Sequence, residues 1–206
     1  MSHTLHRCGT PRNLKDDFVI LSMSAKTVNV KGSGPKMKKL FGILGKHEYV
    51  NFGEVKTGSR YNSEWEIVHE GFKDQSVVHY VFNDRKVLKN VLSEIKEAEL
   101  GLSVIVSGVI DSINDLCQQV GLKMHTVEFS GGILGKTDLL PEKPVLQITT
   151  MCGHGLVATN LVKKMAKQVK RGMKTLEEAA IELAKPCMCG VFNTKRAEDL
   201  LKQFDK

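Results

Sequence analysis

Short apolar runs alternate with amphipathic stretches through the middle of the chain. The runs at 77–82, 104–106 and 124–129 have the length and composition of strands, and the stretches between them repeat apolar residues at helical spacing. Strands that alternate with helices in this way are typical of crossover units in a parallel sheet. We therefore predict an α/β fold in which a mostly parallel sheet with crossover helices is built around a βαβαβ core.

Two further strands are predicted outside this core. The apolar run Phe18–Met23 precedes a helix that Pro35 opens, since proline fits the first turn of a helix. The run Val145–Thr150 also has the composition of a strand and leads directly into a cysteine motif. Residues 48–75 show no clear period, so we expect a hairpin or an irregular excursion there.

The C-terminal part of the chain has a helical pattern. Apolar residues recur at helical spacing from Leu156, the segment Thr175–Glu178 is a capping-box signature, and Pro186 prevents the helix from continuing. We predict an α/β domain over residues 1–150 and a C-terminal helical lobe over residues 151–206. The lobe carries the cysteine motifs and packs on the first domain to give one compact unit.

Composition excludes several classes of protein. The chain has 206 residues, of which 41% are hydrophobic and 26% are charged, as in an ordinary globular protein. It has no apolar stretch near the roughly 20 residues that span a bilayer, so we expect no membrane partner. No apolar run follows the basic residues at the N-terminus, which argues against a secretory signal and predicts a cytoplasmic location.

The net charge of +7 raises the question of nucleic-acid binding. The basic residues gather on the polar faces of predicted helices, without interleaved aromatic residues that could stack on bases. The two groups are Lys36, Lys38, Lys39 and Lys46, and then Lys163, Lys164, Lys167, Lys170 and Arg171. This arrangement argues against nucleic acid and favours an acidic partner protein or a small anionic substrate.

Three of the five cysteines fall in the last 55 residues, in two short motifs. The first is Cys152-Gly-His-Gly and the second is Cys187-Met-Cys189-Gly. An odd number of cysteines in a chain without a signal sequence argues against a disulfide framework and for reduced thiols or metal ligands. Because thiolates beside small residues and an imidazole form a suitable ligand set, Cys152, Cys187 and Cys189 are the predicted metal ligands.

The glycines and the histidine of the two motifs have predicted roles around the metal. Gly153, Gly155 and Gly190 remove side chains near the sulfurs, so that the backbone can approach a cluster and donate N–H groups to it. His154 is the predicted catalytic residue, as a general acid. It is also a candidate metal ligand, or a hydrogen-bond donor to one of the cysteine ligands. Other candidates for the fourth ligand are Cys8, a residue of a partner and a substrate.

Three interpretations of the cofactor stay open. Three thiolates with one nearby nitrogen favour an iron–sulfur cluster, and 4Fe–4S is preferred because one of its irons can stay open to substrate. Zinc in a Cys3His site is the alternative, and thiols without a metal are the third interpretation. We expect Cys152 at a helix start, where the helix dipole lowers the pKa of a thiol. Cys117 lies on the apolar face of a predicted helix and is expected in the core.

Two functions follow from these interpretations. In the first, the chain is an oxygen-sensitive iron–sulfur protein that acts as a redox or open-site enzyme, an oxidoreductase or a lyase, or as a subunit of one. Whether it is an enzyme at all stays open. In the second, zinc stabilises a binding or accessory module whose basic helices dock an acidic partner. Three protein ligands would leave a position for substrate, whereas four would point to structure or electron transfer.

The glycine-rich segment Ser130–Thr137 resembles the phosphate loop of nucleoside triphosphatases. It departs from that motif because Ser130 stands where the family has its first glycine. Pro141 and Pro144 also block the helix that should follow the loop. We therefore expect a flexible glycine loop over a site between the sheet and the lobe.

Overall fold

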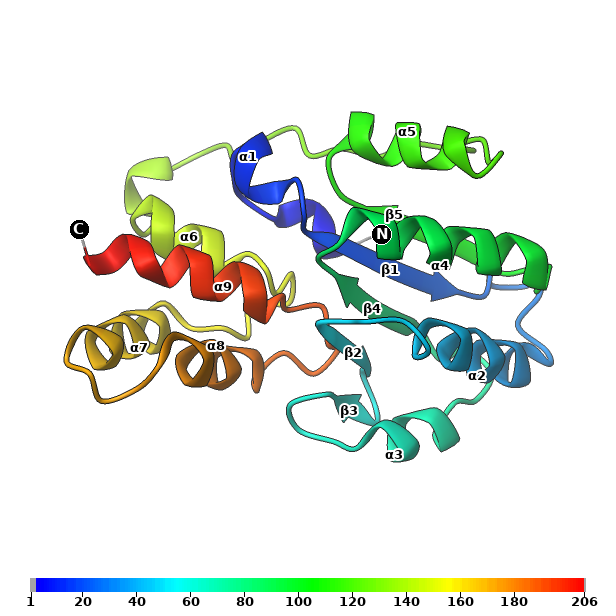
Figure 1. Cartoon of the computed structure of the whole chain (residues 1–206), viewed down its shortest axis with the longest axis horizontal. Helices are drawn as coiled ribbons and strands as arrows, with labels where there is room; N and C mark the ends of the chain where they lie inside the picture. Colours follow the sequence, from blue (N-terminus) through cyan, green and yellow to red (C-terminus); the bar gives the residue numbers. More distant parts are fainter. Residues whose placement is uncertain (1–2, 206) are drawn as a thin grey trace.

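Five strands form one sheet, and helices cover both of its faces, in this computed structural model, which describes residues 3–205 (Figure 1). Met1, Ser2 and Lys206 lie outside the described residues. The strands are β1 (Phe18–Met23), β2 (Asn51–Glu54), β3 (Gly58–Ser59), β4 (Val78–Phe82) and β5 (Ser103–Ser107). They lie in the order β3-β2-β4-β1-β5, and each neighbouring pair is antiparallel.

Nine α-helices and three short 3-10 helices complete the described part of the chain. The α-helices are α1 (Pro11–Leu14), α2 (Ser33–Leu44), α3 (Trp65–Glu70), α4 (Arg85–Ala98), α5 (Ile110–Gln119), α6 (Lys143–Thr149), α7 (Thr159–Lys170), α8 (Leu176–Ala184) and α9 (Thr194–Leu201). The 3-10 helices are η1 (His3–His6), η2 (Thr137–Leu139) and η3 (Lys202–Asp205). Within residues 3–205, no helix combines the length and the apolar character that crossing a membrane requires.

The prediction of a mostly parallel sheet is wrong. Strand β1 lies between β4 and β5 and is antiparallel to both, with Leu21 opposite His79 on one side and Ile105 on the other. Strands β4 and β5 therefore point the same way, and α4 makes the predicted crossover between them, but they are not neighbours. The alternation of strand and helix specifies the direction of the two strands and not which strand lies between them.

Two of the predicted strands are also wrong. Residues 124–129 have no regular secondary structure, and residues 145–150 lie almost entirely in helix α6. A short apolar run has the same composition in a buried helix as in a strand, so periodicity cannot distinguish them. Pro144 occupies the first turn of α6, where its missing N–H has no partner to lose. The buried side chains of Val145 and Ile148 then share one face of the helix.

The sheet divides the apolar interior into two layers. Along β1, Phe18 and Ile20 pack with α2 and α4, whereas Val19 packs with the C-terminal helices on the opposite face. Side chains alternate between the faces of a strand, so burial on both faces explains why the β1 sequence is apolar without a break. Figure 1 shows α2 and α4 beside the sheet on one side and α6, α7, α8 and α9 grouped on the other.

The C-terminal helical layer forms as its caps predict. The Thr175 hydroxyl accepts a hydrogen bond from the Glu178 amide at 3.1 Å, and the Glu178 carboxylate accepts one from the Thr175 amide at 2.8 Å. The Asn193 side chain caps α9 by accepting a bond from the Arg196 amide at 3.0 Å. Helix α6 shares the apolar layer of α7, α8 and α9. The proposed division at residue 150 stays a prediction.

Candidate metal centre

The structure brings together the three cysteines that the sequence predicts as ligands. Cys152 lies in the turn after α6, and Cys187 and Cys189 lie in the tight turn between α8 and α9. All three side chains are almost completely buried. His154 is on the exposed turn that follows Cys152, and its ring nevertheless reaches the sulfur of Cys189. Three thiols and one imidazole therefore meet at the boundary between the helical layer and the sheet.

Neighbouring donor atoms have the spacing of ligands on one tetrahedral ion. The sulfurs of Cys187 and Cys189 are 3.8 Å apart, and the Cys189 sulfur is 3.6 Å from Nδ1 of His154. Zinc–sulfur bonds of about 2.3 Å at tetrahedral angles separate two sulfurs by about 3.8 Å, and a sulfur from an imidazole nitrogen by about 3.6 Å. Thiolates of a 4Fe–4S cluster bind different irons, so they stand further apart than two ligands of one ion. The spacing is therefore closer to that of two ligands on one ion than to that of thiolates on a cluster.

The donors form a row and not a closed ring. Cys152 contacts Cys187, Cys187 contacts Cys189, and Cys189 contacts His154. Among the side chains that the structure describes, no group of three or more His, Cys, Asp or Glu is placed so that it could hold a metal ion. Holding one ion thus requires side-chain rotation at the two ends of the row. The exposed end is the turn with Gly153 and Gly155, where Gly155 has a φ of +68°.

Mutual contact and burial determine which thiol loses its proton most easily. The bond with Cys187 and burial raise the pKa of Cys152 far above its usual range. For Cys187, contact with Cys152 favours the thiolate, but contact with Cys189 and burial outweigh it and raise the pKa to about 12. Contact with Cys187 lowers the pKa of Cys189 in spite of burial. Adjacent thiolates repel one another, and a bound cation would offset this repulsion.

The expected location of Cys152 at a helix start is therefore wrong, and so is its lowered pKa. Its amide donates to the carbonyl of Thr149 at the end of α6, while α7 begins only at Thr159. The C-terminal end of a helix presents carbonyl groups, and these do not stabilise a thiolate. The error follows from the strand that the sequence predicts at 145–150.

A glycine pair lets the cysteine turn sit directly on strand β2. Gly190 has a φ of +73°, and a Cβ atom there would overlap the backbone carbonyl of Phe52. A Cβ atom on Gly53 would lie 2.8 Å from the carbonyl oxygen of Cys189. Both positions thus need glycine for contact between two backbones. Gly190 therefore has a packing role on β2, and its predicted role near a cofactor stays a prediction. Gly53 lies in no sequence motif, so the sequence analysis missed it.

Replacing Gly190 with Ala should lower the free energy of unfolding by about 2 kcal/mol, because the left-handed backbone and the overlap with β2 both oppose a side chain. Gly172→Ala is the matched control, since Gly172 has a φ of +67° and open space around its Cβ position. It should cost only about 1 kcal/mol. Urea unfolding followed by circular dichroism measures both, and equal losses would contradict the packing role of Gly190.

The remaining predicted residues lie outside the row. The Cys8 thiol donates to the carbonyl of His6 at 3.6 Å, and its amide donates to the Thr150 hydroxyl at 3.0 Å. Cys117 is buried in the other apolar layer, on α5, where burial raises its pKa. Residues 130–137 are exposed, and only the short helix η2 follows them in place of a phosphate-binding helix. Neither Cys8 nor Cys117 is positioned as a ligand.

A buried charge cluster beside the cysteine turn was missed by the sequence analysis. The Asp17 carboxylate accepts bonds from Arg7 at 2.7 Å and from Arg196 at 3.2 Å, and Asn193 donates to it at 2.9 Å. Arg7 also donates to the carbonyl of Val191, which closely follows the second cysteine motif. The cluster therefore ties the N-terminal segment and β1 to the turn. Its only signal in the sequence is a charge immediately before an apolar run.

Comparisons with protein-family models, curated proteins and solved structures found no match for this chain. The site itself is therefore the basis for any statement about function. In that site, the two cysteines separated by one residue lack the spacing usual in thiol redox enzymes.

Proposed function

We propose that this chain is a metalloprotein in which Cys152, Cys187, Cys189 and His154 bind one four-coordinate ion, with zinc as the preferred metal. The observation that carries the proposal is the spacing of 3.8 Å between two sulfurs and 3.6 Å between sulfur and imidazole nitrogen. Thiolate and imidazole are the ligands that zinc prefers, and four protein ligands are usual in structural sites. The proposed role of the ion is therefore structural.

The location of the site supports this role. Its ligands come from the turn after α6 and from the turn between α8 and α9, and the second turn packs on β2. An ion bound there would join two turns of the helical layer to each other and hold them against the sheet. Because the unfolded chain lacks such a site, the binding free energy would add directly to the stability of the fold.

The iron–sulfur protein is the second candidate, and one observation favours it. The three buried donors are all thiols, and the fourth donor, His154, lies on an exposed turn. A ligand that is easily displaced would leave an open position for substrate, as an oxidoreductase or lyase with an open iron requires, with His154 then free to act as a general acid. A cluster would, however, need the sulfurs to move apart.

The accessory-module function also includes an acidic partner protein. Helix α7 has no acidic residue, and its exposed face carries Lys163, Lys164, Lys167 and Lys170. Like charges on one helix face repel one another unless an acidic surface neutralises them. We propose this face as the contact with that partner, on the helix that follows the proposed metal site.

Metal analysis of the anaerobically purified protein tests the proposal. We expect about one zinc ion per chain, no acid-labile sulfide and no visible absorbance. About four irons and four sulfides with an absorbance that bleaches on reduction would establish the cluster and overturn the single-ion site. Protein without any bound metal, even after incubation with zinc under reducing conditions, would contradict both metal candidates.

A further inference from the structure

Among the described residues, one edge of the sheet has no further strand beside it. Strand β5 pairs with β1 and is the last strand in the sheet. Its five residues are exposed or half-buried, whereas all five residues of β4 are buried. The N–H and C=O groups on the outer side of such a strand have no ladder partners and can pair with another extended chain.

A second segment without regular secondary structure, residues 123–129, lines the same groove as this edge. Residues 123–129 make no hydrogen bond through their backbone in the described structure. They nevertheless lie near β5, because both segments line one groove of about 730 Å³. Backbone groups without ladder partners therefore occur on both segments that line the groove. Residues 123–129 also belong to the connection between α5 and α6, which is long for a loop in a compact domain and therefore a candidate for function.

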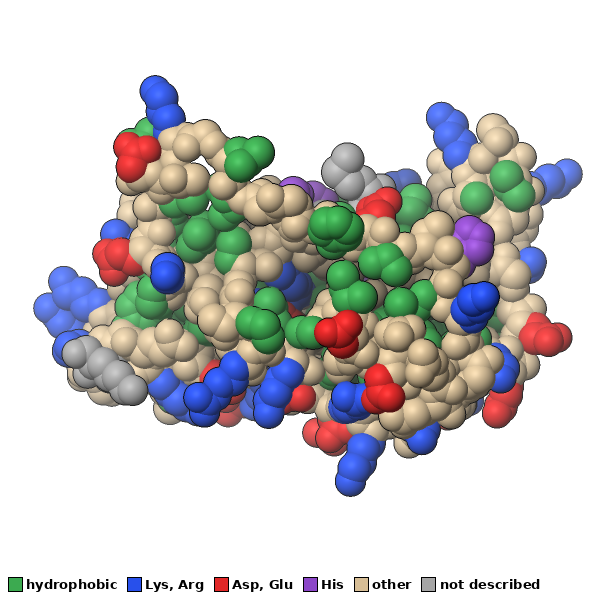
Figure 2. All heavy atoms as spheres, turned by 90° about the horizontal axis from the view of Figure 1, so that it is seen from above, with side chains coloured by type: hydrophobic (Ala, Val, Ile, Leu, Met, Phe, Trp, Pro, Cys, Tyr) green, Lys and Arg blue, Asp and Glu red, His purple; other side chains and the backbone are tan. Residues whose placement is uncertain are grey.

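The walls of the groove are mainly apolar. Half-buried Val106 and buried Ile113 lie on one side, and Val127 and Phe129 are 48% and 75% exposed on the other. Hydrophobic side chains reach the surface across the face that carries α1 and α5, which Figure 2 shows from above. A volume of this size falls within the range of about 300–1,000 Å³ that is typical of ligand clefts.

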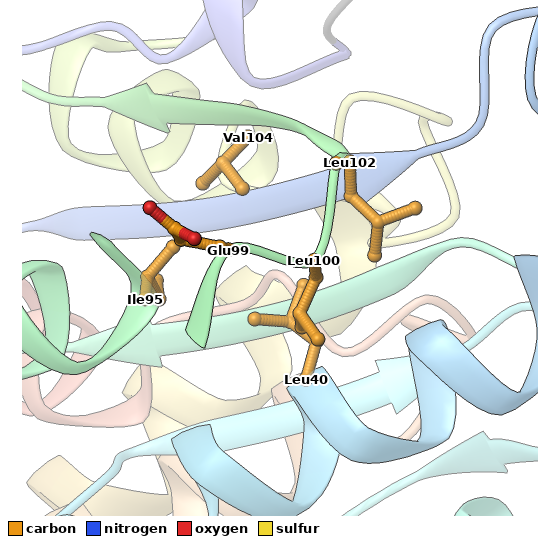
Figure 3. A pocket seen from close by; sticks show the side chains of 7 residues that line it. Leu40, Ile95, Glu99, Leu100, Leu102 and Val104 are labelled. Carbon is orange, nitrogen blue, oxygen red and sulfur yellow. The ribbon is translucent and has the colours of Figure 1, made fainter. Parts of the chain in front are cut away.

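A smaller cavity of about 160 Å³ adjoins the groove, since Ile95, Leu102 and Val104 line both. Figure 3 shows that the side chains lining it come from α2, from the end of α4, from the segment before β5 and from β5 itself. Val104 packs on the α2–α4 side of the sheet. A strand added beside β5 would direct every second side chain to that side, where this cavity offers room for one aliphatic side chain.

We propose that the groove binds an extended peptide of about five residues as a sixth strand beside β5. The peptide backbone would pair with the outer groups of β5 and with residues 123–129, and alternate apolar side chains would fill the walls and the smaller cavity. Backbone pairing supplies affinity in this mode of recognition, and the pockets for alternate side chains supply specificity. This site is separate from the proposed metal centre.

Fluorescence anisotropy with a defined peptide tests this proposal. The probe is a labelled, terminally blocked heptapeptide in which Thr alternates with Val and Leu, and we expect a Kd on the order of 10–100 μM. The same peptide with alternate amides N-methylated along one edge should bind at least tenfold more weakly, because it cannot complete the ladder. Equal binding of both peptides, or no binding of either, would overturn strand addition.

Matched variants locate the site. Val127→Glu and Ile105→Glu place a charge in the groove and should each weaken binding at least tenfold, whereas Ile67→Glu on α3 should leave it unchanged. Val127 and Ile67 are 48% and 55% exposed, so neither of these two substitutions should unfold the chain. Unchanged affinity in Val127→Glu and Ile105→Glu would overturn the proposal. A stable dimer in light scattering that both substitutions dissociate would overturn it in favour of a second copy at β5.

Discussion

Cys187→Ser should weaken metal binding at least about 100-fold and lower the free energy of unfolding by about 3 kcal/mol in the presence of metal. Cys187 contacts both other cysteines and is completely buried, so a hydroxyl at this position removes the central donor of the row. Removing a residue that only orients a metal ligand already lowers metal affinity by about 10- to 100-fold. Removing a metal ligand itself should lower it further. A 100-fold loss of affinity corresponds to about 3 kcal/mol when metal is in excess.

Cys117→Ser is the matched control for this variant. Cys117 is also a buried thiol, but it lies in the other apolar layer, away from the row. Its replacement should reduce stability through the buried hydroxyl while metal content stays at that of the unchanged chain. A chelator should then lower the melting temperature of the unchanged chain and of Cys117→Ser, but not that of Cys187→Ser. Full metal content in Cys187→Ser would refute the proposed ligand set.

The meeting of the three cysteines could be anticipated from sequence because it depends on residue type and local signals. Thiols beside glycine in two turns are unusual, and Pro186 predicts that α8 stops before Cys187. The capping box at Thr175 predicts the start of the helix that leads into the second turn. Each of these signals acts over a few residues and therefore survives in any fold that the rest of the chain adopts.

The sheet topology could not be anticipated in the same way. The β1 sequence is apolar on both faces, which predicts a central strand but not its direction relative to β4 and β5. That direction depends on a connection of more than 50 residues that contains α2, β2, β3 and α3, and residues 48–75 of this connection show no clear period. Residues 124–129 have strand composition without a paired neighbour, and only the structure reveals that a groove lies between them and β5.

Removing the carboxylate of Asp17 should have the second large effect. Asp17→Ala leaves the charges of Arg7 and Arg196 buried without a counter-charge and should lower the free energy of unfolding by about 3–5 kcal/mol. Asp16→Ala is the control, because the Asp16 side chain is 54% exposed and forms only a surface ion pair with Lys15. This substitution should change stability by less than about 1 kcal/mol. Urea unfolding at pH 7 measures both, and similar losses would show that the cluster contributes little.

The pH dependence of stability checks the same cluster independently. Burial alone would raise the pKa of Asp17, but the charges of Arg7 and Arg196 and the bond from Asn193 outweigh it and hold the pKa below the ordinary value of 3.8. A carboxylate with a lowered pKa in the folded state contributes stability that is fully present above the unfolded value and is lost as the pH falls through the folded value. The unchanged chain should therefore lose more stability below about pH 4 than Asp17→Asn, which keeps the shape of the side chain and cannot titrate. Equal pH profiles in acid would mean that Asp17 keeps an ordinary pKa, and the two arginines would then need another source of compensation for their burial.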